Sequence, residues 1–296
     1  MIIAIIGASG FVGNNLIKYL LKNTNYSIRA ICLDIENIKI EEKYKDRVQK
    51  INASVFDYKD MSKVLSGIDV AYYLVHMMAS DKDNFYEKEE QAARTTGKAI
   101  RDAGVKRVIY MSGLGNDNEK LSEHLSSRHN TGNLLREYVQ EVIELRASMI
   151  IGVGSISFEI VRDIVDKSPI ITLPKWSKTK TQPIGIDDAL SYLSKSITLQ
   201  IHKNEIIEIG GPEIMSYEKL IKKYIKFKNK KIIIFRLSIL PEKIAGMFLG
   251  IFMKKDQAQV GQCMLDSFKN EMIVTNSRAK ELFPNICPRK IEEFFI

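Results

Sequence analysis

Three glycines, Gly7, Gly10 and Gly13, lie in the sequence IIAIIGASGFVG, where an apolar run gives way to a helical pattern. Residues 2–6 form the continuous apolar run that a parallel strand buried on both faces requires. Apolar residues then recur at helical spacing through residues 11–21. A strand, a glycine turn and a helix in this order predict a nucleotide-binding turn, because the first exposed amides of the helix attract an anion.

Each glycine of this turn has its own expected role. Gly7 permits the tight turn, Gly10 lets the backbone approach a pyrophosphate, and Gly13 lets the helix pack closely on the strand. A glycine-rich turn without a ligand is the alternative, but an acidic residue at the end of the next strand supplies the expected context. The predicted cofactor-binding residues here are Gly7, Ser9, Gly10, Phe11, Val12 and Gly13.

Apolar runs alternate with helix-like segments through the first half of the chain. The runs are IIAIIG, SIRAICLD, VQKINASV, VAYYLVH, VKRVIYMSG and IELRASMIIG. This alternation predicts an α/β fold, a Rossmann-type doubly wound parallel sheet with a smaller C-terminal substrate lobe. We expect residues 1–152 to form the dinucleotide-binding domain, with segments at about 183–210 returning to it. Residues 153–182 and 211–296 are expected to form the smaller substrate or partner lobe.

The composition of the 296 residues is that of an ordinary globular protein, with 45% hydrophobic residues. The three cysteines are far apart and lack histidines at metal-ligand spacing, so neither a disulfide nor a metal site is predicted. No leader segment precedes the first strand, and no apolar stretch approaches the roughly 20 residues of a membrane helix. Residues 244–253 are interpreted as a core or interface helix. We therefore expect a cytoplasmic protein without a membrane span.

The net charge of +8 permits an anionic partner but does not select one. The densest basic run, residues 219–231, carries seven lysines with apolar residues at helical spacing between them. This pattern favours a solvated helix face over a polyanion-binding face. Nucleic acid is an unlikely partner, because base-stacking aromatic residues and a recognisable motif are missing from the run.

Ligands of open parallel sheets lie at the carboxyl ends of the strands, so the residues at those ends are informative. Asp34 ends the second expected strand. A carboxylate there accepts hydrogen bonds from both ribose hydroxyls of NAD and repels the 2′-phosphate of NADP. The cofactor is therefore NAD or NADP, with NAD favoured. The alternatives are Asp34 as a loop or cap residue, and Lys39 or Lys43 as a phosphate ligand.

The third and fourth strand ends supply further expected cofactor contacts. Ser54 and Val55 are expected beside the adenine. Leu74, Val75 and His76 are expected beside the nicotinamide ribose. For His76, hydrogen bonding in the pocket wall and catalysis are equally good interpretations.

The fifth expected strand ends in the sequence YMSG at residues 110–113, and here the chain resembles the short-chain dehydrogenase/reductase superfamily. The resemblance implies a Ser or Thr at this place, here Ser112, and a dozen or so residues later a Tyr-x-x-x-Lys pair on a helix. In that pair the Tyr acts as acid/base and the Lys holds the ribose. In this chain His124 and Arg128 occupy that four-residue spacing, and the tyrosine is missing. The candidate catalytic residues are Ser112 to orient a carbonyl, His124 to move the proton, and Arg128, which replaces the lysine at the ribose.

The resemblance extends over about residues 1–225. It is carried by GASGFVG, DVAYYLVHMM, GVKRVIYMSGLG, LSEHLSSRHNTG, LRASMIIGVGSISFEIVRD, LPKWSKTKTQPIGIDDAL and EIGGPEIMSYEKL. Together these segments look like the atypical, NmrA-like group of short-chain dehydrogenases, with NAD(P)-binding, nucleoside-diphosphate-sugar epimerase-like members. Membership implies a Rossmann domain that binds a nicotinamide dinucleotide without the usual catalytic tetrad. Leu33 departs from the Arg that many members carry there, and residues 226–296 show no match.

Two functions follow as hypotheses. The first is an NAD(P)-dependent oxidoreductase or epimerase-like enzyme that acts on an unknown small molecule. The alternative is a non-catalytic NAD(P)H-sensing regulator that signals to a protein partner. An enzyme should keep an apolar pocket beside the nicotinamide, with Trp176, Phe158 and Met149 as candidate lining, whereas a sensor can fill that space with its own side chains. Neither the substrate nor the oligomeric state is predicted.

Overall fold

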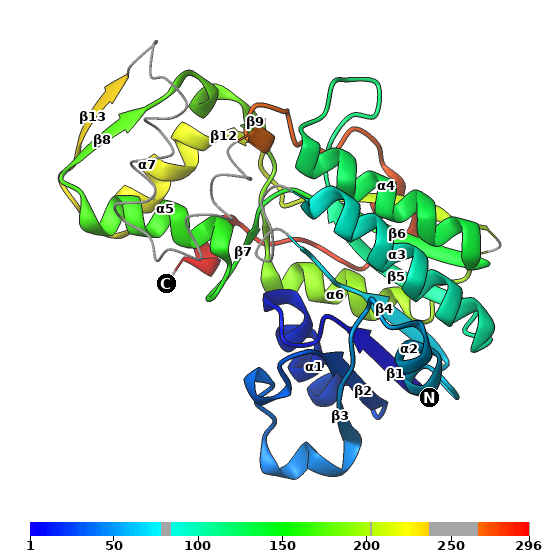
Figure 1. Cartoon of the computed structure of the whole chain (residues 1–296). Helices are drawn as coiled ribbons and strands as arrows, with labels where there is room; N and C mark the ends of the chain where they lie inside the picture. The colour runs from blue at the N-terminus through cyan, green and yellow to red at the C-terminus, as the bar shows by residue number, and fades with distance from the viewer. Residues whose placement is uncertain (78–83, 202, 237–265, 296) are drawn as a thin grey trace.

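A seven-stranded parallel sheet forms the centre of the computed structural model, which describes residues 1–77, 84–201, 203–236 and 266–295 (Figure 1). The strand order β11-β6-β5-β4-β1-β2-β3 reverses at β1, as in doubly wound dinucleotide-binding folds. The predicted Rossmann-type fold is therefore confirmed. The strands are β1 (Ile2–Ile6), β2 (Ser27–Cys32), β3 (Val48–Asn52), β4 (Val70–Tyr73), β5 (Arg107–Gly113), β6 (Glu141–Ala147) and β11 (Glu205–Ile209).

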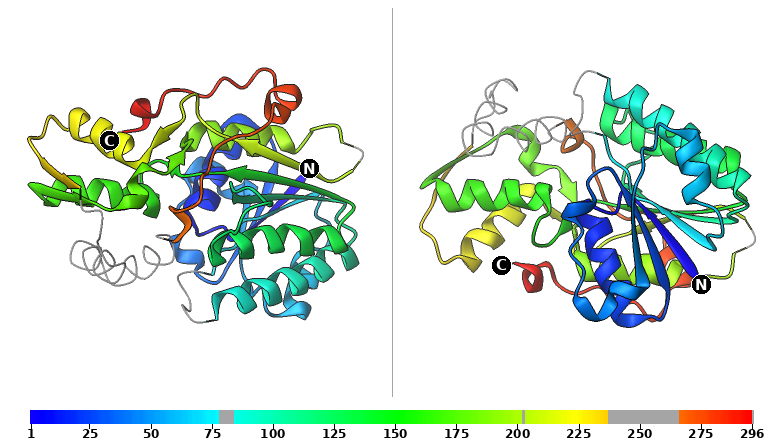
Figure 2. Two further views of the ribbon diagram at one scale, coloured as in Figure 1. Left: turned by 90° about the horizontal axis from the view of Figure 1, so that it is seen from above. Right: turned by 60° about the horizontal axis from the view of Figure 1, so that its bottom comes forward.

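Helices cover both faces of this sheet (Figure 2). Strand β1 shows the alternation, because Ile3 and Ile5 pack into one core and Ala4 and Ile6 into the other. The first core is closed by α1 and α6, and the second by α2, α3 and α4. The bounds are α1 (Phe11–Asn23), α2 (Tyr58–Val64), α3 (Phe85–Asp102), α4 (Glu123–Tyr138) and α6 (Ile186–Ser196).

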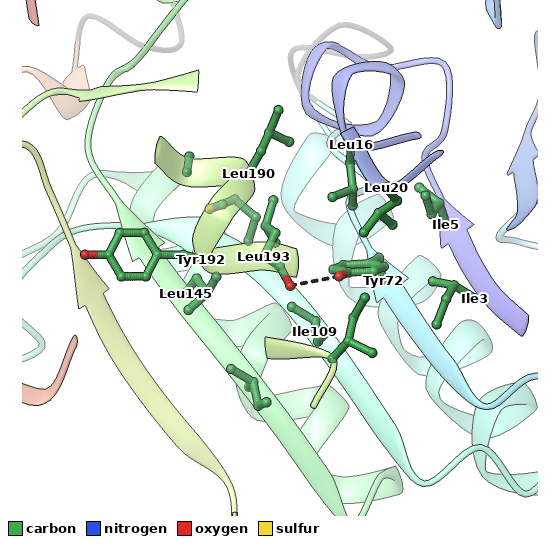
Figure 3. Packing of buried hydrophobic residues seen from close by; sticks show 14 of the residues in the cluster. Ile3, Ile5, Leu16, Leu20, Tyr72, Ile109, Leu145, Leu190, Tyr192 and Leu193 are labelled. Atoms are coloured by element: carbon green, nitrogen blue, oxygen red, sulfur yellow. Dashed lines mark hydrogen bonds between the residues drawn. The ribbon is translucent and has the colours of Figure 1, made fainter. Parts of the chain in front are cut away.

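The core under α1 and α6 carries a buried tyrosine whose polar end is satisfied. Tyr72 on β4 is fully buried, and its hydroxyl donates to the backbone carbonyl of Leu193 at 2.8 Å (Figure 3). A buried hydroxyl without a partner is costly, so this bond fixes the position of α6 on the sheet. Helix α6 and strand β11 thus join the first half of the chain, although the predicted boundary at residue 152 stays a prediction.

A separate hydrophobic core joins α5, β8, α7 and the last described residues. Phe158 on α5 stacks on Phe295 at a centroid distance of 5.6 Å and meets Tyr224 on α7 edge-on at 5.3 Å. The remaining elements are β7 (Ile150–Ile151), α5 (Ile156–Lys167), β8 (Ile170–Leu173), β9 (Lys180–Thr181), β10 (Ile184–Gly185), β12 (Met215–Ser216), α7 (Tyr217–Phe227), β13 (Ile233–Arg236) and α10 (Arg278–Leu282), with short 3₁₀ turns at Ile35–Asn37, Glu42–Arg47, Lys175–Lys178 and Ile291–Phe294.

The lysine-rich run predicted from the sequence falls mostly on α7. Its apolar residues face the separate core, and lysines of the outer face pair with carboxylates of the same protein. Lys222 lies 2.6 Å from Glu218, and Lys223 lies 2.6 Å from Glu213. Several of these charges are thus already matched.

Two predicted features fall outside the described residues, namely the helix at 244–253 and Cys263. Within the described part, Cys32 is a buried free thiol and Cys287 an exposed one. None of the helices in that part is both long enough and apolar enough to cross a membrane.

Candidate functional site

The glycine turn links β1 to α1. Gly7 has a φ of 89°, and a Cβ there would lie 2.7 Å from the carbonyl oxygen of Leu74, so both backbone conformation and space require glycine. A Cβ on Gly13 would overlap the carbonyl oxygen of Gly7. These two glycines are required by the packing of α1 against the sheet, independently of any ligand.

Gly10 differs from the other two glycines. Its backbone is extended, with a φ of −68° and a ψ of 168°, and a Cβ there would meet only the carbonyl oxygen of Gly7, at 3.3 Å. The protein alone therefore has room for a Cβ at Gly10, and the expected role of this glycine, to let the backbone approach a pyrophosphate, stays a prediction. Gly10 lines the cavity, so a side chain there would enter space that a ligand can use. In the described structure no side chain caps the N-terminus of α1 and its first turn holds no acidic residue, so its amides remain available to an anion.

A cavity of about 440 Å³ extends from this turn along the carboxyl ends of the central strands. Its volume falls within the roughly 300–1,000 Å³ typical of small-molecule sites. The cavity is lined by the strand ends, by α4, by the start of α5 and by Ser267, Phe268 and Met272. The lining residues are Gly10, Phe11, Val12, Gly13, Leu74, His76, Met111, Ser112, Gly113, His124, Leu125, Arg128, Ala147, Ser148, Met149, Ile150, Ser155, Ile156, Ser157, Ser267, Phe268 and Met272.

The cavity brings together nine of the residues predicted from the sequence, from the glycine turn, the end of β4, the end of β5 and α4. They are Gly10, Phe11, Val12, Gly13, Leu74, His76, Ser112, His124 and Arg128. Six other predicted residues lie outside its lining: Gly7, Ser9, Asp34, Ser54, Val55 and Val75. Gly7 shapes the turn, and Asp34 follows β2 on the exposed surface.

Two histidines meet head-on at the cavity. The Nε2 atoms of His76 and His124 lie 3.0 Å apart, the ring centres are 5.1 Å apart, and the ring planes differ by only 6°. The distance between the ring centres is close to the sum of the Nε2–Nε2 distance and the two distances from each Nε2 to its own ring centre. The two rings therefore lie nearly in one plane and meet edge to edge. The contact is a hydrogen bond between imidazoles, and only one of the two nitrogens holds the proton.

A row of hydrogen bonds continues from both ends of this pair. His76 Nδ1 lies 2.8 Å from a carboxylate oxygen of Glu89, and His124 Nδ1 lies 2.8 Å from the hydroxyl of Ser267. The hydroxyl of Ser127 donates to the other oxygen of Glu89 at 2.5 Å. We call Glu89, His76, His124 and Ser267 the histidine relay. The relay runs from Glu89, which is only 3% exposed, to the surface of the cavity.

The ionisation of Glu89 sets the direction of every proton in the relay. Burial alone would raise the pKa of Glu89, but the Arg128 guanidinium and the hydrogen bond from His76 hold it far below its usual range. An ionised carboxylate only accepts, so His76 donates through Nδ1 and accepts at Nε2. His124 then donates through Nε2, and its Nδ1 accepts from Ser267. In this state both imidazoles are neutral.

Burial also acts on the histidines themselves. The side chain of His76 is still 36% exposed, and its partial loss of water together with the nearby Arg128 charge lowers its pKa. Burial, then His76 and Arg128, lower the pKa of His124 well below the ordinary value of 6.5. A protonated His124 is therefore a stronger acid than a free imidazole. Its Nδ1 is the nitrogen that faces the Ser267 side of the cavity.

Arg128 has a structural role that the sequence did not indicate. Its guanidinium donates to the carbonyl of Val75 at 2.8 Å and to the carbonyl of Met111 at 2.6 Å, and it lies 3.5 Å from Glu89. It also lies 4.8 Å from the ring centre of Tyr110, a cation–π distance. Arg128 thus ties the ends of β4 and β5 together and neutralises Glu89. Its predicted contact with the ribose stays a prediction.

Two hydroxyls at the cavity lack partners. Ser112, at the end of β5, is 6% exposed, and its oxygen makes no hydrogen bond to the described residues. The hydroxyl of Ser148, directly after β6, is likewise buried and unbonded within that part of the chain. Since buried polar atoms are normally satisfied, both hydroxyls indicate the place of a ligand.

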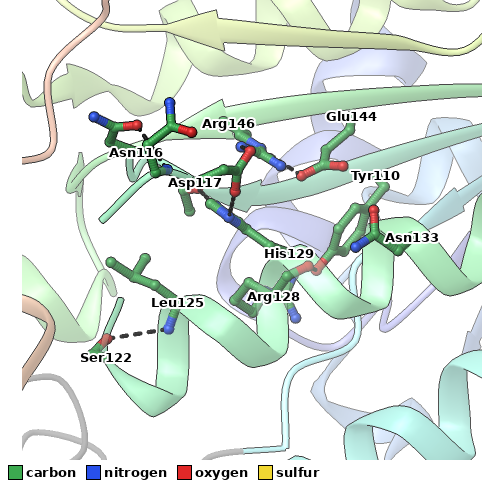
Figure 4. Close-up of polar contacts among 12 residues, drawn as sticks. Tyr110, Asn116, Asp117, Ser122, Leu125, Arg128, His129, Asn133, Glu144 and Arg146 are labelled. Carbon is green, nitrogen blue, oxygen red and sulfur yellow. Dashed lines mark hydrogen bonds and ion pairs between the residues drawn. The ribbon is translucent and has the colours of Figure 1, made fainter. Parts of the chain in front are cut away.

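A charged network next to the cavity holds α4 on the sheet (Figure 4). His129 Nε2 donates to the carbonyl of Gly113 at 2.9 Å, and its Nδ1 lies 2.6 Å from Asp117. Arg146 on β6 bridges Asp117 and Glu144, each at 2.8 Å. Burial would raise the pKa of Asp117, but Arg146 holds it below its usual range. Through this network the helix that carries His124 and Arg128 keeps a fixed position relative to β5 and β6.

Sequence reasoning missed Glu89, Ser148 and Ser267. Glu89 lies among many charged residues of one helix, and no local pattern distinguishes it. Ser267 lies 143 residues from its partner His124.

Of the three side chains expected to line the pocket, only Met149 does so. Phe158 lies in the separate core. Trp176 packs on Phe268 and Tyr217 at centroid distances of 5.3 and 6.1 Å. Aromatic rings gain free energy from such ring contacts, so Trp176 packs against the separate core and does not line the cavity.

Comparison with known proteins agrees with this geometry. Residues 7–151 match a family model described as NAD(P)H-binding. Cinnamoyl-CoA reductase 2 of Arabidopsis thaliana is 25% identical over 119 residues. That match covers 38% of this chain and 36% of the plant protein, so it spans about a third of the curated relative.

Solved structures resemble the fold over nearly the whole chain. Triphenylmethane reductase from Citrobacter sp., complexed with NADP(H), has a TM-score of 0.77 at 18% identity, covering 99% of this chain and 98% of that one. A nucleoside-diphosphate-sugar epimerase from Staphylococcus aureus has a TM-score of 0.76 at 12% identity, with 100% and 99% covered. At these identities the likeness is one of fold, and it agrees with the predicted resemblance to atypical, NmrA-like and epimerase-like short-chain dehydrogenases.

Proposed function

We propose that the protein is an NAD(P)H-dependent reductase that acts on a small carbonyl compound, with His124 as the proton donor. The observation that carries the proposal is the histidine relay, which opens on the cavity that also contains the dinucleotide-binding turn. The cavity itself favours an enzyme over a sensor, since the side chains of the described residues leave open the space expected for a substrate. Similarity to proteins described as reductases supports the same reaction class.

The residues present fit a nicotinamide dinucleotide. Gly10 leaves a gap at the turn, the first amides of α1 are uncapped in the described structure, and Ser112 presents a free hydroxyl further along the same cavity. When bound, the reduced dinucleotide supplies the hydride. The residues of this chain have to position the acceptor, exclude water and deliver one proton.

The proton step follows from the geometry of the relay. The Ser112 hydroxyl donates a hydrogen bond to the acceptor oxygen and so orients the carbonyl. As the carbon gains the hydride, the C=O π bond breaks and its electron pair stays on oxygen. That oxygen takes the proton from Nδ1 of protonated His124, either directly or through the Ser267 hydroxyl, and leaves His124 neutral with its remaining proton directed at His76. Glu89 and His76 hold the ring in the required orientation.

This assignment predicts a pH dependence. Because the pKa of His124 lies well below 6.5, the protonated fraction falls about tenfold per pH unit above neutrality. We expect kcat/KM for carbonyl reduction to fall about tenfold per unit from pH 7 to pH 9, and kcat/KM for alcohol oxidation to stay flat there. Initial rates of NADH and NADPH oxidation with a panel of aldehydes and ketones measure this. A pH-independent reduction rate would exclude His124 as the donor, and no turnover across the panel would favour the regulator.

A second prediction concerns the choice of cofactor. Asp34 and Glu36 are both exposed directly after β2, and the Asp34 carboxylate accepts a hydrogen bond from the side-chain amide of Asn37. Since two carboxylates repel an extra phosphate, we expect NADH to bind at least about tenfold more tightly than NADPH. Asp34→Ala should remove most of this preference, whereas Glu36→Ala, which removes an equal charge two residues on, should remove less. Calorimetric titration of each variant with both cofactors decides it, and tighter NADPH binding to the unchanged protein would refute it.

A further inference from the structure

We propose that the acceptor is an uncharged, largely apolar carbonyl compound, with an aromatic or branched aliphatic body, and is neither a nucleotide sugar nor an acid. This inference rests on the proposed reductase function and specifies its substrate class. It is drawn from the part of the cavity lining that belongs neither to the glycine turn nor to the histidine relay.

The walls of that part are apolar. They come from α4, from the loop after β6, from the start of α5 and from residues 267–272. The apolar lining side chains there are Leu125, Met149, Ile150, Ile156, Phe268 and Met272. Most belong to or flank the separate core, so they are held by packing. Such a surface gains free energy by contacting apolar groups and gains nothing from contact with hydroxyls or charges.

Charge in the cavity is already balanced. Among the described lining residues Arg128 is the side chain with a full charge, and its guanidinium is occupied by Glu89 and by the carbonyls of Val75 and Met111. A carboxylate or diphosphate in the substrate part would leave water without gaining a free cation. Transfer of an unpaired anion into such a site is strongly unfavourable.

Most polar side chains of the described cavity lining already form hydrogen bonds within the protein. The hydroxyl of Ser155 donates to the carbonyl of Ile150 at 2.6 Å and lies 3.0 Å from the hydroxyl of Ser157. This leaves the unbonded hydroxyls of Ser112 and Ser148, which lie at neighbouring strand ends. Two donors suit a single carbonyl oxygen. The several hydroxyls of a sugar ring would lack partners, and a site without matching groups rejects them.

The far wall is fixed to the relay. Ser122 at the start of α4 donates its amide to Asn270 at 3.0 Å, and the Asn270 side-chain amide donates to the carbonyl of Lys120 at 3.0 Å. The same segment supplies Ser267 to the relay and Phe268 to the apolar wall. Residues 267–272 therefore contribute both to the apolar wall that selects the substrate and to the hydrogen bond that holds His124.

A matched pair of aldehydes tests the proposal. We expect kcat/KM for 2-naphthaldehyde to exceed that for 6-formyl-2-naphthoate, which differs by one carboxylate, at least a hundredfold. Met149→Lys should reduce this ratio at least tenfold by placing a cation in the wall, whereas Met149→Leu should leave it nearly unchanged. Ile156→Lys, at a half-buried lining position, serves if the first lysine variant does not fold.

Binding measured without turnover separates this inference from the reductase function. Calorimetry on the protein loaded with oxidised cofactor should detect 2-naphthaldehyde and only much weaker binding of 6-formyl-2-naphthoate or UDP-glucose. Binding of 2-naphthaldehyde without reduction would refute the reductase function and leave the substrate class standing. Equal or tighter binding of the carboxylate or of UDP-glucose would overturn the substrate class, whatever the turnover.

Discussion

Replacing Gly10 with valine abolishes binding of the nicotinamide dinucleotide and leaves the fold intact; this is the largest effect that we expect from a single substitution. A Cβ at Gly10 meets only one atom, at 3.3 Å, and the backbone there is extended, so the protein accommodates it. The branched side chain enters the cavity next to the uncapped amides of α1, which have to reach the pyrophosphate. Calorimetry with NADH and NADPH should show a loss of affinity of at least about a hundredfold.

Gly13→Ala is the matched control for this experiment. Its Cβ overlaps the carbonyl oxygen of Gly7 inside the protein, so that variant loses stability in thermal unfolding before any ligand is added. Gly10→Val should unfold at nearly the unchanged temperature. If Gly10→Val bound the dinucleotide with undiminished affinity, the turn would not be the binding site.

His124→Ala lowers turnover by roughly a hundredfold or more and leaves cofactor affinity nearly unchanged, because the loss is that of a general acid. Steady-state kinetics with the best aldehyde of the panel, together with calorimetry of the cofactor, measure both quantities. The pH dependence of the remaining reduction should disappear in this variant. A small effect on kcat with a large effect on cofactor binding would instead place His124 at the dinucleotide.

Ser267→Ala is the companion variant, since it removes the hydroxyl that holds His124 Nδ1 and keeps the imidazole. This variant should lower turnover roughly tenfold and retain the pH dependence.

Arg128→Ala is a poor test of the predicted ribose contact. It leaves Glu89 buried without its cation, and breaking such a pair typically costs about 3–5 kcal/mol of stability.

Local patterns predicted the parts of the site that are local in the chain. The run at residues 2–6, the three glycines and the helical spacing after them lie within some twenty residues, and their periodicity reports burial directly. The spacing of His124 and Arg128 likewise placed both on one face of a helix, and both line the cavity. For the same reason the alternation of apolar runs with helical segments predicted a doubly wound parallel sheet, which the structure confirms.

The remaining parts depend on contacts between distant segments. Nothing near Glu89 distinguishes it from the other carboxylates of α3, because its burial is created by His76 and Arg128 on other elements. Apolar residues raise a related difficulty. Phe158 and Met149 both belong to the separate core, yet only Met149 also lines the cavity. The apolar character of a residue indicates that it is buried, but it does not indicate which other residues or which cavity it contacts.

The hydrogen bond between His124 and Ser267 has a consequence for the order in which the protein becomes competent during synthesis. Domains generally fold from the N-terminus as the ribosome releases them. The dinucleotide-binding turn needs only the first strands and helices, whereas the Nδ1 atom of His124 gains its partner only after position 267 has emerged, 143 residues later. An emerging chain can therefore capture a nicotinamide dinucleotide long before it can use it, and the captured ligand stabilises the early sheet by mass action.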